Sequence, residues 1–222
     1  LAACPAQARQ VKLNGPLEPG EEVTENPFWA PEVRQLTASP DRKWVVFSTD
    51  FNDDWTQTFI VPAGGGEALP LLPPWDYDVD SCVFTPDSRR WVGAAMYRYG
   101  GHGIYSSPLP PDEGAPVQLT PPGLPGSPRF TLNPDGSRVF YLLDVLDDEV
   151  HELYSAPVTG GAIVKLNPPL PQDQDVAVYK VSPDGTRAVF TVGGGSPLVH
   201  SGLYSSRADG AEPPVALYVP PV

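Results

Sequence analysis

The chain is poor in basic residues. Its 14 lysines and arginines stand against 27 aspartates and glutamates, which gives a formal net charge of −13 over 222 residues. Because affinity for nucleic acid depends on neutralising phosphates with Lys and Arg, this balance argues against a nucleic-acid partner. It also disfavours electrostatic docking on anionic lipid. The remaining explanation of the charge is solubility.

Long apolar runs and the common enzyme motifs are missing as well. No run approaches the roughly 18 consecutive apolar residues that a membrane-spanning helix needs. The sequence contains no G-x-S-x-G, no H-E-x-x-H, no cysteine pair at zinc spacing and no phosphate-binding glycine loop. These absences predict a chain without a catalytic site or a bound cofactor of its own.

Cysteine is scarce, with only Cys4 and Cys82. The opening Leu1-Ala2-Ala3-Cys4 is similar to a bacterial lipobox, in which the cysteine becomes lipidated, and the Pro-rich residues 1–31 that contain it have the composition of a tether. This motif predicts a location in the bacterial cell envelope or periplasm, with membrane contact only through a lipid anchor. Cys82 lies in an apolar strand pattern, which favours a buried, inert thiol, although a Cys4–Cys82 disulfide stays open.

Proline and glycine are abundant, with 30 and 21 copies, and they fall between apolar runs. So many breakers exclude long helices and indicate turns between strands. The turns repeat: a [Ser/Thr/Asn]-Pro-Asp tripeptide occurs four times, 46, 48 and 49 residues apart, and an apolar strand-like run follows each copy. A period in this range is typical of a repeat architecture. The copies are Ser39-Pro40-Asp41, Thr85-Pro86-Asp87, Asn133-Pro134-Asp135 and Ser182-Pro183-Asp184.

Alignment on Pro-Asp yields a unit of four strands. One strand precedes the tripeptide, an apolar run follows it, a third strand contains Leu-Tyr-Ser or a variant of it, and a short fourth strand ends the unit. Gly136 and Gly185 supply the residue that tolerates positive φ after Pro-Asp, whereas Arg42 and Ser88 occupy that position in the first two copies. These two turns are therefore expected to be slightly strained or of a different type. A basic residue before each apolar run predicts pairing with the turn or with a neighbouring repeat: Lys43, Arg90, Arg138 and Arg187.

Four antiparallel strands in 40 to 50 residues are the pattern of a β-propeller blade. Ser-Pro-Asp-Gly-Thr-Arg-Ala-Val-Phe at 182–190, followed by Leu203-Tyr204 and Asp209-Gly210, resembles the WD40-like repeat of TolB-type propellers, which also builds the propeller domain of prolyl oligopeptidases. The resemblance implies an all-β propeller of four-stranded antiparallel blades, which forms either a small ring or part of a larger one. The expected blades span about 32–74, 75–126, 127–172 and 173–222.

Candidate site residues fall on the side of the blades opposite the Pro-Asp turns, where we expect most of the acidic clusters to gather. His102, His151 and His200 are 49 residues apart and occupy one slot in three blades. They favour hydrogen bonds to neighbouring loops over a shared metal, because equivalent positions on adjacent blades lie roughly 10 Å or more apart, whereas ligands of one ion lie about 2 Å from it. Asp76, Asp78 and Asp80 alternate, which would put three carboxylates on one strand face and suit Ca²⁺. The Gly and distal Glu of an EF-hand are absent, so a solvated loop between blades is the favoured alternative.

These features predict a non-catalytic, exported scaffold that presents its loops to a protein or peptide partner. Aromatic residues dominate interaction hot spots, so Trp55, Trp75, Tyr97 and Tyr99 are candidate anchors, with packing between blades as the alternative. Two other functions stay open: a substrate-gating propeller of a serine peptidase whose catalytic domain lies outside this chain, and a propeller that binds a metal ion or a glycan.

Overall fold

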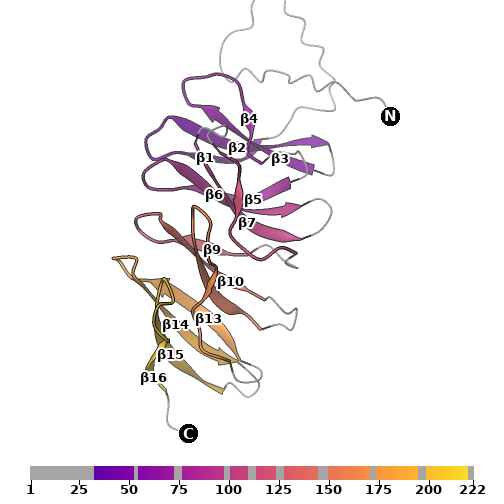
Figure 1. The fold of residues 1–222 in the computed structure, drawn as a ribbon. Helices are drawn as coiled ribbons and strands as arrows, with labels where there is room; N and C mark the ends of the chain where they lie inside the picture. The colour runs from indigo at the N-terminus through magenta and orange to yellow at the C-terminus, as the bar shows by residue number, and fades with distance from the viewer. Residues whose placement is uncertain are drawn as a thin grey trace, which may run out of the picture.

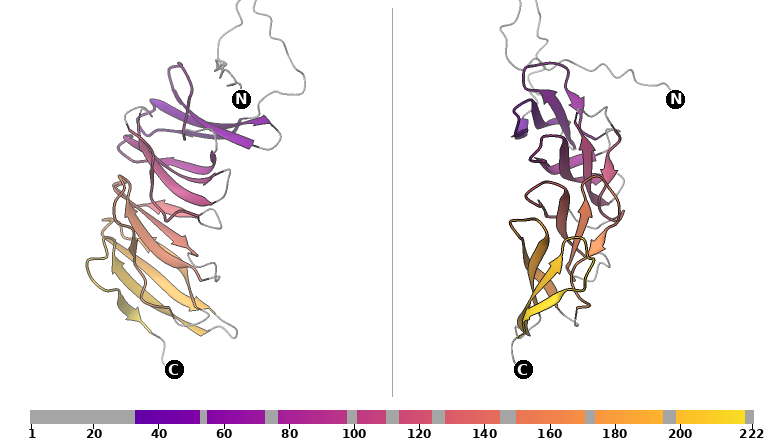
Figure 2. Two further views of the ribbon diagram at one scale, coloured as in Figure 1. Left: turned by 45° about the vertical axis from the view of Figure 1, so that its right-hand side comes forward. Right: turned by 60° about the vertical axis from the view of Figure 1, so that its left-hand side comes forward.

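Four sheets of four antiparallel strands make up the structure, a computed structural model that describes residues 33–52, 55–72, 77–97, 101–109, 114–123, 128–144, 150–170, 174–194 and 199–219. The sheets follow one another in chain order, with the first and the last at opposite ends of the array (Figures 1 and 2). Within the described ranges no helix is long and apolar enough to cross a membrane. The all-β class and the four-stranded blades predicted from the sequence are confirmed.

Each sheet is a meander in which neighbouring strands in sequence are neighbours in space. Blade 1 contains β1 (Val33–Ala38), β2 (Trp44–Asn52), β3 (Trp55–Pro62) and β4 (Leu69–Pro70). Blade 2 contains β5 (Tyr77–Phe84), β6 (Arg90–Tyr97), β7 (His102–Pro108) and β8 (Val117–Gln118). Blade 3 contains β9 (Phe130–Leu132), β10 (Arg138–Leu143), β11 (Glu152–Pro157) and β12 (Val164–Lys165). Blade 4 contains β13 (Asp175–Val181), β14 (Arg187–Gly194), β15 (Val199–Arg207) and β16 (Val215–Tyr218).

The hydrophobic core lies between the blades. Alternate residues of the second strand face opposite neighbours, so Val92 of β6 packs toward blade 3 while Trp91 packs toward blade 1, and both are fully buried. This two-sided burial explains the near-continuous apolar runs of the sequence. Tyrosine hydroxyls join the blades further, since Tyr141 donates to the carbonyl of Leu119 (2.7 Å).

The two ends of the array differ. On the side of blade 1 that faces away from blade 2, Phe47, Phe59 and Val61 pack together and are buried. On blade 4, by contrast, Leu217 and Tyr218 of the outermost strand are 54% and 57% exposed. The equivalent strands β4, β8 and β12 have two residues each, whereas β16 has four. Blade 4 therefore ends in an apolar strand that no other described element covers.

The Pro-Asp turns repeat one hydrogen-bond pattern. The carboxylate of the aspartate accepts the backbone N–H two residues further on, as in the bond from Ser137 N to Asp135 Oδ1 (2.9 Å). The residue directly after the aspartate has positive φ in every copy, including the two without glycine, Arg42 (60°) and Ser88 (56°). Of the two alternatives for these turns, the structure shows the strained one, because both non-glycine residues adopt the left-handed conformation.

These turns predict a dependence of stability on acid. Hydrogen bonds from the hydroxyls of Ser39, Thr85 and Ser182 are the main cause that lowers the pKa of Asp41, Asp87 and Asp184 below the ordinary 3.8. A carboxyl whose folded pKa is depressed stabilises the fold above its unfolded pKa, and this contribution is lost as the pH falls through the folded pKa. Replacing the three aspartates by asparagine should therefore flatten the loss of stability between about pH 5 and about pH 2.

Urea unfolding at a series of pH values measures this effect. The control is Glu67→Gln, which removes an exposed acidic residue outside the turns and should keep the steepness of the wild type. An unchanged pH dependence in the triple variant would contradict the stabilising role of the turn carboxylates.

Candidate functional site

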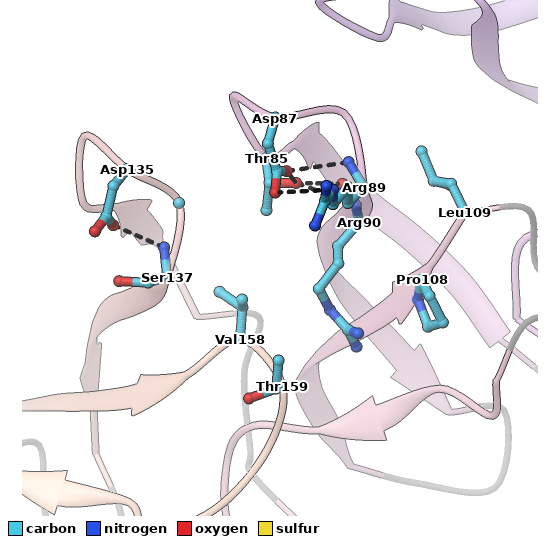
Figure 3. A pocket seen from close by; sticks show the side chains of 11 residues that line it. Thr85, Asp87, Arg89, Arg90, Pro108, Leu109, Asp135, Ser137, Val158 and Thr159 are labelled. Atoms are coloured by element: carbon cyan, nitrogen blue, oxygen red, sulfur yellow. Dashed lines mark hydrogen bonds and ion pairs between the residues drawn. The ribbon is translucent and has the colours of Figure 1, made fainter.

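A groove opens between blades 2 and 3 on the side of the Pro-Asp turns (Figure 3). Its volume is about 610 Å³, within the range of small-ligand sites. The walls combine charged, hydroxyl and apolar side chains from four turns, two on each blade. The lining residues are Thr85, Asp87, Arg89, Arg90, Pro108, Leu109, Asp135, Gly136, Ser137, Val158 and Thr159.

Arg90 at the start of β6 is the half-buried cation of this groove. Its Nε donates to the hydroxyl of Ser106 in β7 (3.0 Å), and in Figure 3 its side chain runs down the groove toward Pro108 and Thr159. Burial lowers the pKa of Arg90, and the nearby carboxylate of Asp87 opposes this effect. The guanidinium therefore stays charged in a position partly withdrawn from water.

The same arginine–serine pair recurs in two other blades. Arg138 Nη2 donates to Ser155 Oγ (2.9 Å), and Arg187 Nε donates to Ser205 Oγ (2.8 Å). The hydrogen bonds of these arginines go to the third strand of their own blade, which the sequence did not predict. The predicted partners act through charge: Asp87 of the turn on Arg90, and Asp209 of the neighbouring blade on Arg138.

Lys43 does not belong to this series. The register places Trp44 opposite Pro62, just as Arg90 lies opposite Pro108, so blade 1 has a tryptophan at the position of the arginine. Lys43 lies one residue earlier, and its Nζ is 3.4 Å from the carboxylate of Asp41 in the turn.

The histidines lie on the opposite side of the blades, beside carboxylates. His102 Nδ1 is 3.9 Å from Asp80 Oδ2, and His151 Nδ1 is 3.6 Å from Asp175 Oδ1. The backbone N–H of His151 also donates to Asp175 (2.6 Å), which joins blade 3 to the first strand of blade 4. His200 belongs to β15, and the structure does not describe its side chain.

The expected row of three carboxylates is interrupted. The pairing of β5 with β6 shifts register between Val79 and Ser81, which makes Asp80 a bulge residue. The regular alternation that would put Asp78 and Asp80 on one face of the strand is therefore broken. Asp76 lies outside the described residues. Among the residues that the structure describes, no three His, Cys, Asp or Glu side chains are placed to hold a metal ion.

Of the candidate aromatic anchors, Tyr97 is described with its side chain. Its ring is 5.1 Å from that of Tyr77, which in turn is 5.3 Å from Tyr105, so it belongs to a packed aromatic group of blade 2. Trp55 begins β3 without a described side chain, and Trp75 and Tyr99 lie outside the described residues. Their roles as anchors stay predictions.

Cys82 is a free thiol in β5 that packs against the core between blades 1 and 2. Burial raises its pKa to about 12, so the thiol is protonated at neutral pH, as expected for an unreactive cysteine. Cys4, the candidate for lipidation, lies outside the described residues.

Sequence reasoning did not find the groove, because it placed function on the side of the loops and assigned the Pro-Asp side to turn chemistry. The available signal was the repeat itself. Residues 85–90 and 135–137 come from equivalent turns, and equivalent turns of adjacent blades lie next to each other in a propeller.

Comparisons with known proteins identify the fold. No protein-family model and no curated protein matches the sequence. TolB from Acinetobacter baumannii matches in structure with a TM-score of 0.50 and 14% identity, over 84% of this chain and 43% of TolB. A prolyl endopeptidase matches with a TM-score of 0.56 and 11% identity, over 86% of this chain and 30% of the enzyme. An oligogalacturonate lyase in complex with manganese has the same TM-score and 16% identity, over 84% and 53% of the two chains.

The chain is thus an all-β protein with propeller blades of the type found in TolB and in peptidase propeller domains. It spans less than two thirds of the length of each of these structures. At these identities the likeness establishes the fold, as the repeat motif predicted, and leaves the activity to be argued from the site.

Proposed function

We propose that the chain is a non-catalytic scaffold that binds a segment of a protein or peptide partner. The observation that carries this proposal is the groove between blades 2 and 3, whose walls offer apolar surface from Pro108, Leu109 and Val158 beside the charged groups of Arg89 and Arg90. An extended segment needs this combination, because apolar contacts supply affinity while a few placed polar groups fix orientation.

The chemistry of the described titratable groups supports binding rather than catalysis. The serine hydroxyls of the third strands are engaged by arginines of the second, and Cys82 is protonated. An activated nucleophile needs an adjacent base or a depressed pKa, which these groups lack. As the location we propose the bacterial envelope, on the strength of the Leu1-Ala2-Ala3-Cys4 motif.

A variant that fills the groove tests the proposal. Peptides are selected from a random library on the immobilised protein and are then titrated against Thr159→Trp, whose indole would occupy the groove beside Arg90. We expect binding to weaken at least ~10-fold, or about 1.4 kcal/mol, because the peptide loses its apolar contacts.

The matched control is Ala162→Trp, which adds the same indole at an exposed position of the same connection, outside the groove. It should bind the selected peptides like the wild type. If no peptide is enriched, or if both tryptophan variants bind equally well, the groove is not the binding site and the proposal is wrong.

A further inference from the structure

We propose that Arg90 is the receptor for a carboxylate of the bound partner, so that the groove takes a peptide segment with one acidic group at this point. The inference rests on the proposed function and names the chemistry of its ligand. It derives from a difference between two equivalent interfaces: the interface between blades 2 and 3, and the interface between blades 3 and 4.

The guanidinium of Arg90 has unused donors. Its one hydrogen bond within the described part of the chain is from Nε to Ser106, so both terminal nitrogens are without an acceptor there. Arg90 is one of the residues that line the groove. A half-buried guanidinium has lost part of its hydration, so an acceptor that meets it in the fork geometry of a carboxylate binds more strongly than at a fully hydrated side chain.

The next interface along the array contains the carboxylate that this one lacks. Arg138 occupies in blade 3 the position of Arg90. Burial lowers the pKa of Arg138, and the carboxylate of Asp209 in the outer turn of blade 4 opposes this effect. The position of Asp209 in blade 3 belongs to Thr159, because Gly160 and Gly210 close the same turn with equivalent backbone hydrogen bonds. Asp209 is itself held by two hydrogen bonds from Arg207 (3.0 and 2.7 Å), and it acts on Arg138 through its charge. Arg90 has the uncharged Thr159 at the equivalent position of the groove.

The other acidic groups of the groove are already engaged. Asp87 accepts hydrogen bonds from the hydroxyl of Thr85 and from the backbone N–H of Arg89. The Nε of Arg89 is also 4.0 Å from the carboxylate of Asp87. Asp135 accepts the backbone N–H of Ser137. Two arginines and two aspartates leave no net charge in the groove. Together with the negative charge of the whole chain, this balance favours one carboxylate on an otherwise neutral segment over a polyanion.

The test introduces a carboxylate into the groove by substitution. Thr159→Asp places a carboxylate next to Arg90 at the position equivalent to Asp209, and Thr159→Asn is its uncharged control of nearly equal size. The probes are the peptides acetyl-Gly-Ala-Leu-Glu-amide and acetyl-Gly-Ala-Leu-Gln-amide for a side-chain carboxylate. A second pair, acetyl-Gly-Ala-Leu-Ala with a free or an amidated C-terminus, represents a terminal carboxylate. Binding is followed by NMR through the backbone amides of Arg89, Ser137 and Thr159.

We expect the wild type and Thr159→Asn to prefer the charged member of at least one pair by about 5-fold or more, and Thr159→Asp to lose this preference. The pair that is distinguished identifies the source of the carboxylate. In addition, Thr159→Asp should melt about 1–3 °C above Thr159→Asn, because Arg90 gains an ion pair.

Two results would overturn the inference. The first is equal binding of charged and uncharged peptides by the wild type, and the second is an undiminished preference in Thr159→Asp. Either result leaves the proposed function intact as long as peptides still bind Ala162→Trp and not Thr159→Trp. If Thr159→Trp also binds normally, the groove itself is excluded and both proposals fail.

Discussion

Replacing Leu166 by alanine is expected to lower the free energy of unfolding by about 3 kcal/mol, whereas the same replacement at Leu217 should change it by less than about 0.5 kcal/mol. Both residues directly follow the fourth-strand residue that pairs with the tyrosine of the third strand, Lys165 with Tyr154 and Ala216 with Tyr204. Leu166 is 0% exposed in the core between blades 3 and 4, while Leu217 is 54% exposed. Leu217 also lies in a bulge of β16, because the pairing with β15 shifts register between Leu203 and Tyr204. The different costs of the two replacements would compare a leucine packed between two blades with one on a strand that no other described element covers.

Urea denaturation followed by tryptophan fluorescence gives both values, and Leu119→Ala serves as a second buried example because Leu119 is 1% exposed at the same position of blade 2. Leu119→Ala should resemble Leu166→Ala. If Leu217→Ala proved as costly as the buried replacements, another surface would have to cover blade 4 in solution.

The second large effect is expected from Gly210→Ala, with a loss of about 2–5 kcal/mol. Gly210 has a φ of +65°, and a Cβ added to it would lie 2.1 Å from Cγ1 of Val164 in the preceding blade. The valine is β-branched and stiff at χ1, so it cannot turn away cheaply. The alanine thus meets both backbone strain and overpacking between blades 3 and 4.

Gly65→Ala separates these two causes. Gly65 closes the equivalent turn of blade 1 with a φ of +92°, and no atom lies within 4 Å of the position that an added Cβ would take. This variant should lose only the backbone contribution, about 1–2 kcal/mol. Val164→Ala removes the clashing methyl group, so the double variant should lose less stability than the sum of the two single variants, which a double-mutant cycle measures. Equal losses for both glycine variants would show that contact with Val164 is unimportant.

Much of the fold could be predicted because the turn chemistry is local. Proline and aspartate encode the hairpin by their own φ and hydrogen bonds, so each Pro-Asp marks the junction of the first and second strands wherever it occurs. The same locality explains the positive φ of Arg42 and Ser88, which the sequence left open between a strained turn and a different type: the turn imposes this conformation on the residue that follows the aspartate.

Features that depend on contacts between strands or blades could not be predicted in the same way. The bulge at Asp80 is a property of the pairing of β5 with β6, and the alternation of aspartates gives no sign of it. The partner of Arg90 depends on register with β7. The groove requires the turns of two blades to lie side by side, and the contrast between Thr159 and Asp209 becomes meaningful only when each is seen beside the arginine of the preceding blade.

Local unfolding is expected to start at β16, the exposed fourth strand of blade 4. Local unfolding costs least where few buried apolar contacts hold a segment, and β16 is exposed along its whole length. The amides of β16 and then of β15 should therefore exchange with solvent before those of β6 and β10, which are buried on both faces. The groove lies between blades 2 and 3, so β16 and β15 can open without dismantling its walls.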